Sequence, residues 1–205
     1  GKEGSASVQV NSGITFESVI ETPDLQFRYG AVGGAKESWS YTKGDYGDNY
    51  VDEYFDTGEQ YFNSVSVSGG NERTQAYFSL ANTTASGITP GNKYGKNNLT
   101  FKQSTKLFND KVKITSNILL AQEKTDGRNR AGYYNNPLTG LYWFPRNLPF
   151  YNYKDNYRLF DETRNVYVMN WDSAIGGADH LQSNPYWILN SEAQEDRTNR
   201  VIASL

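Results

Sequence analysis

Residues 63–84 alternate between apolar and polar side chains on both sides of a glycine-containing turn. The apolar positions on the two arms are Val65, Val67, Ala76, Phe78 and Leu80. A period of two places successive side chains on opposite faces of a β-strand. Glycines at positions 69 and 70 supply the positive φ angles that a tight reversal needs. The segment therefore predicts a β-hairpin with one apolar face and one face of hydroxyls, amides and a phenol.

The same alternation recurs along the rest of the chain. It predicts strands at residues 5–17, 61–68, 74–83, 97–107, 112–121 and 196–205. Ser12 interrupts the apolar face of the first strand, and Gln103 and Thr105 fall on the apolar side of the fourth. We expect the segment 50–55 to form either a helical turn or the upper end of the second strand.

Short turns and long connections alternate strictly between these strands. The links at 69–73 and 108–111 are tight, whereas those at 20–60, 85–96 and 122–194 are longer. In an up-and-down sheet this order places every long connection at one end. Outer-membrane barrels have this asymmetry, with short periplasmic turns and longer extracellular loops. The chain is therefore expected to enter the sheet from the periplasmic side.

Composition limits the classes of protein to which the chain could belong. The 205 residues contain no cysteine, which excludes a disulfide framework and a thiolate metal site. A net charge of −3 gives no reason to expect a nucleic-acid partner. No apolar run is long enough for a membrane helix. A transmembrane barrel remains compatible with this polar composition, because half of each strand faces a wet lumen.

A soluble sandwich or soluble barrel would show the same alternation. One feature argues against it. A compact domain rarely contains a structureless connection as long as residues 122–194. Five or six strands leave two open edges, whose backbone groups cannot stay unpaired in lipid. A membrane sheet of this size must therefore be one part of a larger barrel.

Several short motifs, in order along most of the chain, resemble the early barrel of SusC/RagA-like TonB-dependent outer-membrane transporters. Residues 1–4 (GKEG) resemble the junction between plug and barrel, and residues 64–70 (SVSVSGG) resemble the second strand and first periplasmic turn. Residues 77–80 (YFSL), with Gly87 and Ile88, continue the pattern. Residues 135–142 (NNPLTGLY) and 184–190 (NPYWILN) resemble the third extracellular loop.

The resemblance implies an all-β fold: an antiparallel, up-and-down transmembrane β-barrel, of which residues 1–205 are the N-terminal part. It implies a bacterial outer-membrane location, contact with membrane lipid, and import of large nutrients, either oligosaccharides or peptides. It also implies a SusD-like surface lipoprotein as a lid, and energy from TonB through segments that lie outside this chain. It implies no enzymatic activity and no cofactor.

Aromatic residues and one arginine in the longest connection are the candidates for substrate or lid contact. They are Tyr142, Trp143, Phe144, Arg146, Tyr186 and Trp187. Aromatic faces stack on sugar rings or peptide side chains, and the arginine fork donates to carboxylates or hydroxyls. The alternative is that these side chains pack the connection against itself or against the lid.

Other polar clusters are weaker indications of a functional site than these aromatic residues. The acidic run Asp45, Asp48, Asp52, Glu53 and Asp56 lacks the spacing of a calcium loop, which favours a solvated loop. His180 is the only histidine, so a histidine-based zinc site is not expected. No G-x-S-x-G elbow is present, which makes a hydrolase the weakest hypothesis. The main alternative to the transporter is a secreted β-rich carbohydrate-binding module.

Overall fold

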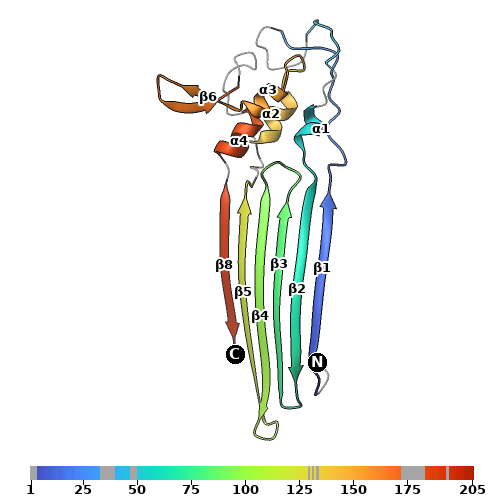
Figure 1. The fold of residues 1–205 in the computed structure, drawn as a ribbon, viewed down its shortest axis with the longest axis vertical. Coiled ribbons are helices and arrows are strands. Elements are labelled where there is room, and N and C mark those ends of the chain that lie inside the picture. Colours follow the sequence, from blue (N-terminus) through green and yellow to red (C-terminus); the bar gives the residue numbers. More distant parts are fainter. Residues whose placement is uncertain are drawn as a thin grey trace.

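The computed structural model describes residues 4–32, 40–46, 50–128, 130, 132, 134–171, 183–192 and 194–205. Its main element is a six-stranded antiparallel sheet in the order β1-β2-β3-β4-β5-β8 (Figure 1). The strands are β1 (Ser7–Glu17), β2 (Gly58–Gly70), β3 (Thr74–Ser86), β4 (Lys93–Leu107), β5 (Val112–Asp126) and β8 (Glu195–Ser204). The all-β, up-and-down prediction is confirmed for these strands.

Each predicted strand is present, but four of them are longer than the alternation indicated. The extra residues of β3, β4 and β5 lie at the end away from the tight turns, where hydroxyl and charged side chains replace apolar ones. Polar side chains on both faces hide the period of two, although the backbone continues to pair there. This explains why the sequence pattern ended too early.

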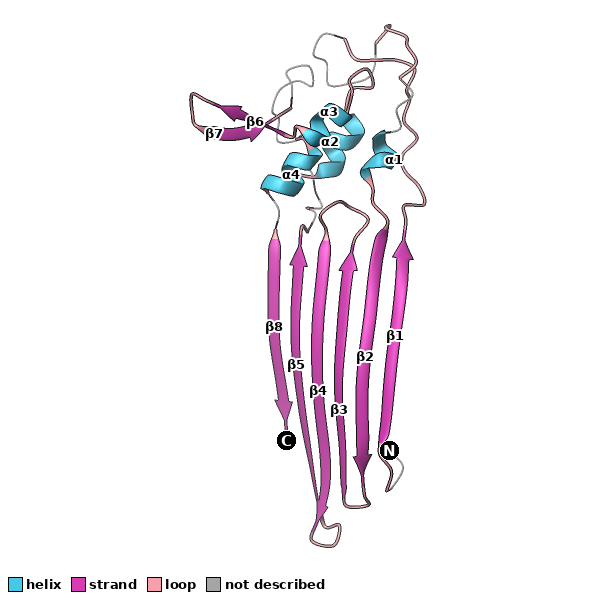
Figure 2. Ribbon diagram, viewed as in Figure 1, coloured by secondary structure: helices cyan, strands magenta, loops and turns pink. Residues whose placement is uncertain are grey.

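All long connections lie at one end of the sheet and both tight turns at the other (Figure 2). In the β2–β3 turn the amide oxygen of Asn71 accepts from the backbone N–H groups of Arg73 and Thr74, at 3.0 and 2.8 Å. Gly70 has a φ of 150°, and a β-carbon there would lie 2.1 Å from the carbonyl oxygen of Thr74. Glycine is therefore required at this position.

The register aligns the apolar side chains into two straight rows across all six strands. One row contains Val8, Val67, Phe78, Phe101, Ile118 and Ala203, and the next contains Val10, Val65, Leu80, Leu99, Leu120 and Val201. We call the side of the sheet with these rows the apolar face, and the other side the polar face. Directly opposed side chains of this kind stabilise each strand pair.

A third row on the apolar face consists of hydrogen-bonding side chains. It contains Ser12, Asn63, Asn82, Asn97, Gln122 and Asn199. The Ser12 hydroxyl donates to the Asn63 amide oxygen at 2.7 Å, and the Asn82 amide donates to that of Asn97 at 2.8 Å. The interruption that the sequence showed at Ser12 therefore belongs to a polar row that crosses the whole sheet.

No second layer of the described residues covers either face of the sheet. Val10 is 73 % exposed and Leu80 is 43 % exposed. On β5 the polar-face residues Asn117 and Ala121 are half-buried, while the apolar-face residue Leu120 remains exposed. On β5 the apolar side chains of the apolar face are thus more exposed than these polar-face residues, which is the reverse of a soluble sheet.

The 122–194 connection is not structureless, which corrects the sequence-based expectation for the parts the structure describes. Its first residues extend β5, and it then forms α2 (Pro137–Trp143), α3 (Tyr151–Asp155), the hairpin β6 (Arg158–Asp161) and β7 (Val166–Met169), and α4 (Pro185–Ser191). The segment 50–55 forms a helix, α1 (Tyr50–Tyr54). Within the described residues, the helices are all too short or too polar to cross a membrane.

We predict that residues 1–205, produced alone in aqueous buffer, will self-associate. The edges of β1 and β8 present unpaired backbone groups, and the apolar face lies open to solvent. Size-exclusion chromatography with light scattering measures this directly.

The same chain in detergent micelles is the control, because a micelle covers the apolar face and should reduce the association. A monomer that stays soluble and unfolds cooperatively in plain buffer would contradict the prediction.

Candidate functional site

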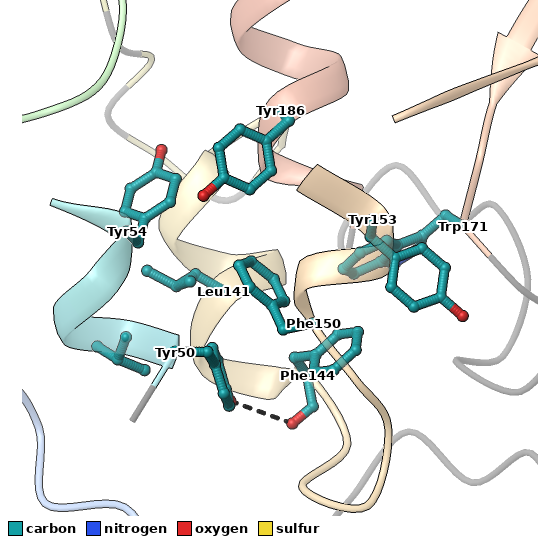
Figure 3. Close-up of a cluster of buried hydrophobic side chains, with 9 residues drawn as sticks. Tyr50, Tyr54, Leu141, Phe144, Phe150, Tyr153, Trp171 and Tyr186 are labelled. Atoms are coloured by element: carbon teal, nitrogen blue, oxygen red, sulfur yellow. Dashed lines mark hydrogen bonds between the residues drawn. The ribbon is translucent and has the colours of Figure 1, made fainter. Parts of the chain in front are cut away.

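The long connections enclose a small aromatic core beyond the loop end of the sheet (Figure 3). We call it the loop cluster, and its buried members are Tyr50, Val51, Tyr54, Leu141, Phe144, Phe150, Tyr153, Trp171 and Tyr186. The rings pack mainly edge to face; for example, the centroids of Phe144 and Phe150 lie 5.0 Å apart at 78°. Such pairs add about 0.5–1.5 kcal/mol each beyond the area they bury. The loops are therefore held by a core of their own.

Two of the helices begin with the same pair of residues, asparagine followed by proline. The Asn136 side chain caps α2 by accepting from the Leu138 N–H at 3.0 Å. The Asn184 side chain caps α4 by accepting from the Tyr186 N–H at 2.9 Å. Proline suits the first helical position, because its missing N–H would be unsatisfied there in any case. The local sequence thus starts both helices.

Helices α2 and α4 touch at a glycine. A β-carbon on Gly140 would lie 2.1 Å from the carbonyl oxygen of Ser183, just before α4. Any larger residue would push the two helices apart.

Asn184 also connects distant segments of the loop cluster. Its side-chain nitrogen donates to the carbonyl oxygens of Tyr153 and Asn170, at 3.0 Å each. The residue is fully buried, with 0 % exposure. One side chain therefore caps α4 and joins it by hydrogen bonds to α3 and to the residue that follows β7.

Arg146 is a second connector. Its guanidinium donates to the carbonyl of Tyr142 at 2.9 Å and to that of Gln26 at 3.1 Å. It also donates to the carbonyl of Phe144 and the hydroxyl of Tyr50. A cation at the last carbonyls of a helix is favourable, because that end carries partial negative charge. Arg146 thus closes α2 and joins it to α1 and the first long connection.

The structure divides the six predicted contact residues into three groups by burial. Phe144 is fully buried and Tyr186 is 8 % exposed. Arg146, Tyr142 and Trp187 are half-buried. Trp143 alone of the six is exposed, at 50 %. Packing within the loop cluster therefore accounts for most of these side chains, and Trp143 is the one that presents a broad surface to a ligand or partner.

Burial raises the pKa of three tyrosines of the loop cluster above the ordinary value of a phenol. Desolvation raises the pKa of Tyr50 to about 12, against an opposing effect of the Arg146 guanidinium. Desolvation, with the nearby Asp56 carboxylate, raises the pKa of Tyr186 to about 12. Burial raises the pKa of Tyr54 as well. These phenols therefore act as hydrogen-bonding groups and ring surfaces near neutral pH.

Sequence reasoning missed a hollow beside the loop cluster, of about 260 Å³. Its lining residues are Tyr50, Glu53, Phe150, Tyr151, Lys154 and Tyr186. They come from α1, α3 with its preceding residue, and α4, which are far apart in the sequence. The only local signal was the pair Tyr50 and Glu53, which three-residue spacing places on one face of a helix.

The acidic run is described at Asp45, Asp52, Glu53 and Asp56. Within the described residues, no group of three or more histidine, aspartate or glutamate side chains could hold a metal ion. Asp48 and His180 lie outside the described residues. Of the acidic run, Asp52 accepts a long hydrogen bond of 3.4 Å from the hydroxyl of Thr22.

Comparison with protein-family models and with curated proteins finds no match to this chain.

We predict that Asn184→Ala destabilises the loop cluster more than Asn136→Ala does. Both changes remove a helix cap, which costs about 1 kcal/mol. Asn184→Ala also removes the hydrogen bonds to the carbonyls of Tyr153 and Asn170, each of which contributes about 0.5–1.5 kcal/mol. Hydrogen exchange of the α2 and α4 amides measures the difference.

Asn184→Asp separates the two roles of this side chain. The carboxylate keeps the cap acceptor but loses the donor to both carbonyls, so the variant should remain clearly less stable than the wild type. Equal protection in the Asn136→Ala and Asn184→Ala variants would show that the bridge contributes nothing.

Proposed function

We propose that this chain is the N-terminal part of the barrel of an outer-membrane, TonB-dependent transporter. It would import large nutrients, oligosaccharides or peptides, together with a SusD-like surface lipoprotein. The observation that carries the proposal is the apolar face: two unbroken rows across six strands, with nothing among the described residues covering them.

Energetics favour lipid as the cover of this face. Burying one large aliphatic or aromatic side chain is worth about 1.5–3 kcal/mol. The two apolar rows contain almost a dozen such side chains, each left partly exposed by the sheet itself. A hydrocarbon environment removes this surface from water without requiring a second protein layer. The polar face then lines an aqueous lumen, as in outer-membrane barrels.

Crowding supports the same orientation. Side chains on the polar face are more often half-buried than their neighbours on the apolar face, as Asn117 and Ile118 show on β5. Inner side chains crowd together when a sheet curves, and outer ones spread apart. An apolar outer face and a polar inner face are what a membrane barrel requires.

The apolar stretch also crosses the strands obliquely. It covers Val8 to Phe16 on β1 and Val112 to Leu120 on β5, while the register sets Ile118 level with Val8. The stretch is thus displaced by about six residues over four strand-to-strand steps. At about 3.3 Å per residue and 4.8 Å per strand, this is an inclination of roughly 45°. Strands of outer-membrane barrels tilt by about 35–45°.

The secreted carbohydrate-binding module would need a second layer over the apolar face. The described residues place their only other core, the loop cluster, beyond the end of the sheet. That arrangement suits loops above a membrane, where aromatic side chains meet nutrient or lid.

We predict that arginine at Val67 or Phe78 impairs folding into lipid bilayers, whereas arginine at Ser66 or Ser79 does not. The first pair would face hydrocarbon, where arginine costs about 2–4 kcal/mol near the midplane. The second pair, next in sequence, would face the lumen. Folding of the full-length protein into vesicles, followed by heat-modifiable gel mobility, measures this.

Equal effects on the two faces would refute the assignment of outside and inside. If none of the four variants changes folding into vesicles, the membrane proposal itself fails.

We further predict that Trp143→Ala lowers nutrient uptake or lid association while barrel assembly stays normal. Trp143 is half-exposed at the end of α2 and offers a free ring surface. Arg146→Ala should instead loosen the loop cluster, because four hydrogen bonds depend on it. Uptake assays and lid pull-down, with proteolysis of the loops, separate the two effects.

Phe108→Ala is the matched control, since Phe108 is an exposed aromatic residue at the tight-turn end of the sheet. Wild-type uptake and wild-type lid binding in the Trp143→Ala variant would show that the contacts lie elsewhere in the protein.

A further inference from the structure

The hollow beside the loop cluster combines an aromatic floor with two opposite charges. Three buried rings form its floor: Tyr50, Phe150 and Tyr186. The centroids of Tyr50 and Phe150 lie 4.8 Å apart, and those of Phe150 and Tyr186 lie 5.9 Å apart. Figure 3 shows these rings one after another between α1 and α4. All three rings line the hollow, and each keeps 5–8 % of its surface exposed.

The floor is rigid, because its members are held from behind. The Tyr50 hydroxyl donates to the carbonyl of Phe144 at 3.3 Å and accepts from Arg146. The backbone N–H of Tyr186 is bonded to the buried Asn184. Since the hydroxyl of Tyr50 is already engaged, this residue offers mainly its ring to the hollow. A preorganised surface loses little entropy when a ligand binds.

The rim carries one acid and one base from different helices. Glu53 comes from α1, and Lys154 comes from α3. Both are exposed, and the Lys154 ammonium lies 5.9 Å from the centroid of the Tyr186 ring. Ion pairs among the described loop residues join other partners, such as Arg164 with Asp161. No ion pair among the described residues joins Glu53 to Lys154, so both charges remain available to a ligand.

We propose that this hollow binds a zwitterionic dipeptide with an apolar side chain. Glu53 would accept from the α-ammonium group, Lys154 would donate to the carboxylate, and the three rings would hold the side chain. The inference rests on the proposed import function, because it names the nutrient class that this site selects.

Size and charge favour this occupant over a saccharide. Pockets for drug-sized ligands measure about 300–1,000 Å³, so a hollow of about 260 Å³ suits a smaller ligand such as a dipeptide. A neutral sugar ring needs several hydrogen-bonding groups around its edge, whereas this rim offers two full charges of opposite sign. Lost charge pairing penalises the wrong ligand strongly, which makes the two charges a specificity device.

Calorimetric titration of the full-length protein in detergent tests the proposal with leucylleucine as the probe. We expect the dipeptide to bind, and N-acetyl-leucylleucine and leucylleucinamide to bind about tenfold more weakly, because each lacks one charge. Free leucine distinguishes an amino-acid site from a peptide site. Maltose serves as the saccharide with which the dipeptide is compared.

Each rim residue should matter only to the ligand that carries its partner charge. Glu53→Gln should weaken leucylleucine about tenfold and leave the N-acetyl form unchanged, and Lys154→Met should do the same for the amide form. The exchange of both charges, Glu53→Lys with Lys154→Glu, should restore part of the affinity. Glu162→Gln removes an exposed acid between β6 and β7, outside the hollow, and should change nothing.

Leucylleucine affinity that is unaffected by either rim substitution would overturn the proposal, and so would maltose binding that falls in both variants. Neither outcome bears on the transporter proposal. The arginine substitutions on the two faces of the sheet test that proposal separately. A failure of those substitutions would, in turn, leave the measured peptide affinity standing.

Discussion

The structure depends on cross-strand alignment of apolar side chains. Residues from six strands fall into straight rows, so that Val67 faces Val8 on one side and Phe78 on the other. A slip by one residue would turn every apolar side chain to the polar face. The tight turns keep the register at one end of the sheet, where glycine is the only residue type that fits at position 70. The sheet is therefore specified by pairing rather than by a core between layers.

The loops follow a different principle. Their aromatic residues come from segments that are far apart in the sequence, and a few buried polar side chains hold them together. Arg146 and Asn184 each donate hydrogen bonds to several backbone carbonyls from distant segments. Since backbone carbonyls cannot be left buried without a partner, these side chains decide whether the loops fold. The cluster gives Trp143 and the hollow fixed positions at the loop end of the sheet.

The sequence was sufficient for the sheet and insufficient for the loops. Period-two alternation is a local signal, and it located the strands, the turns and the apolar face. It ended early in β5, because Gln122 and Lys124 break the apolar pattern while the backbone continues to pair. The loop cluster depends on contacts such as Tyr50 with Phe144, which no local pattern records. The Asn-Pro pairs before α2 and α4 were the local sign of helices within the long connection. Arg146 was proposed as a contact residue because of its chemistry, and only the three-dimensional structure reveals its role in packing.

The central claim is that the apolar face meets hydrocarbon and the polar face meets water. Site-specific fluorescence quenching along β3 tests it most directly. A probe on a single cysteine at Phe78, Ser79, Leu80 or Ala81, in the full-length protein within vesicles, would be exposed to brominated lipid and to aqueous iodide in turn. The account predicts that lipid quenches the probes at 78 and 80, and that iodide quenches those at 79 and 81. Quenching without this alternation, or no lipid quenching at any of the four positions, would contradict it.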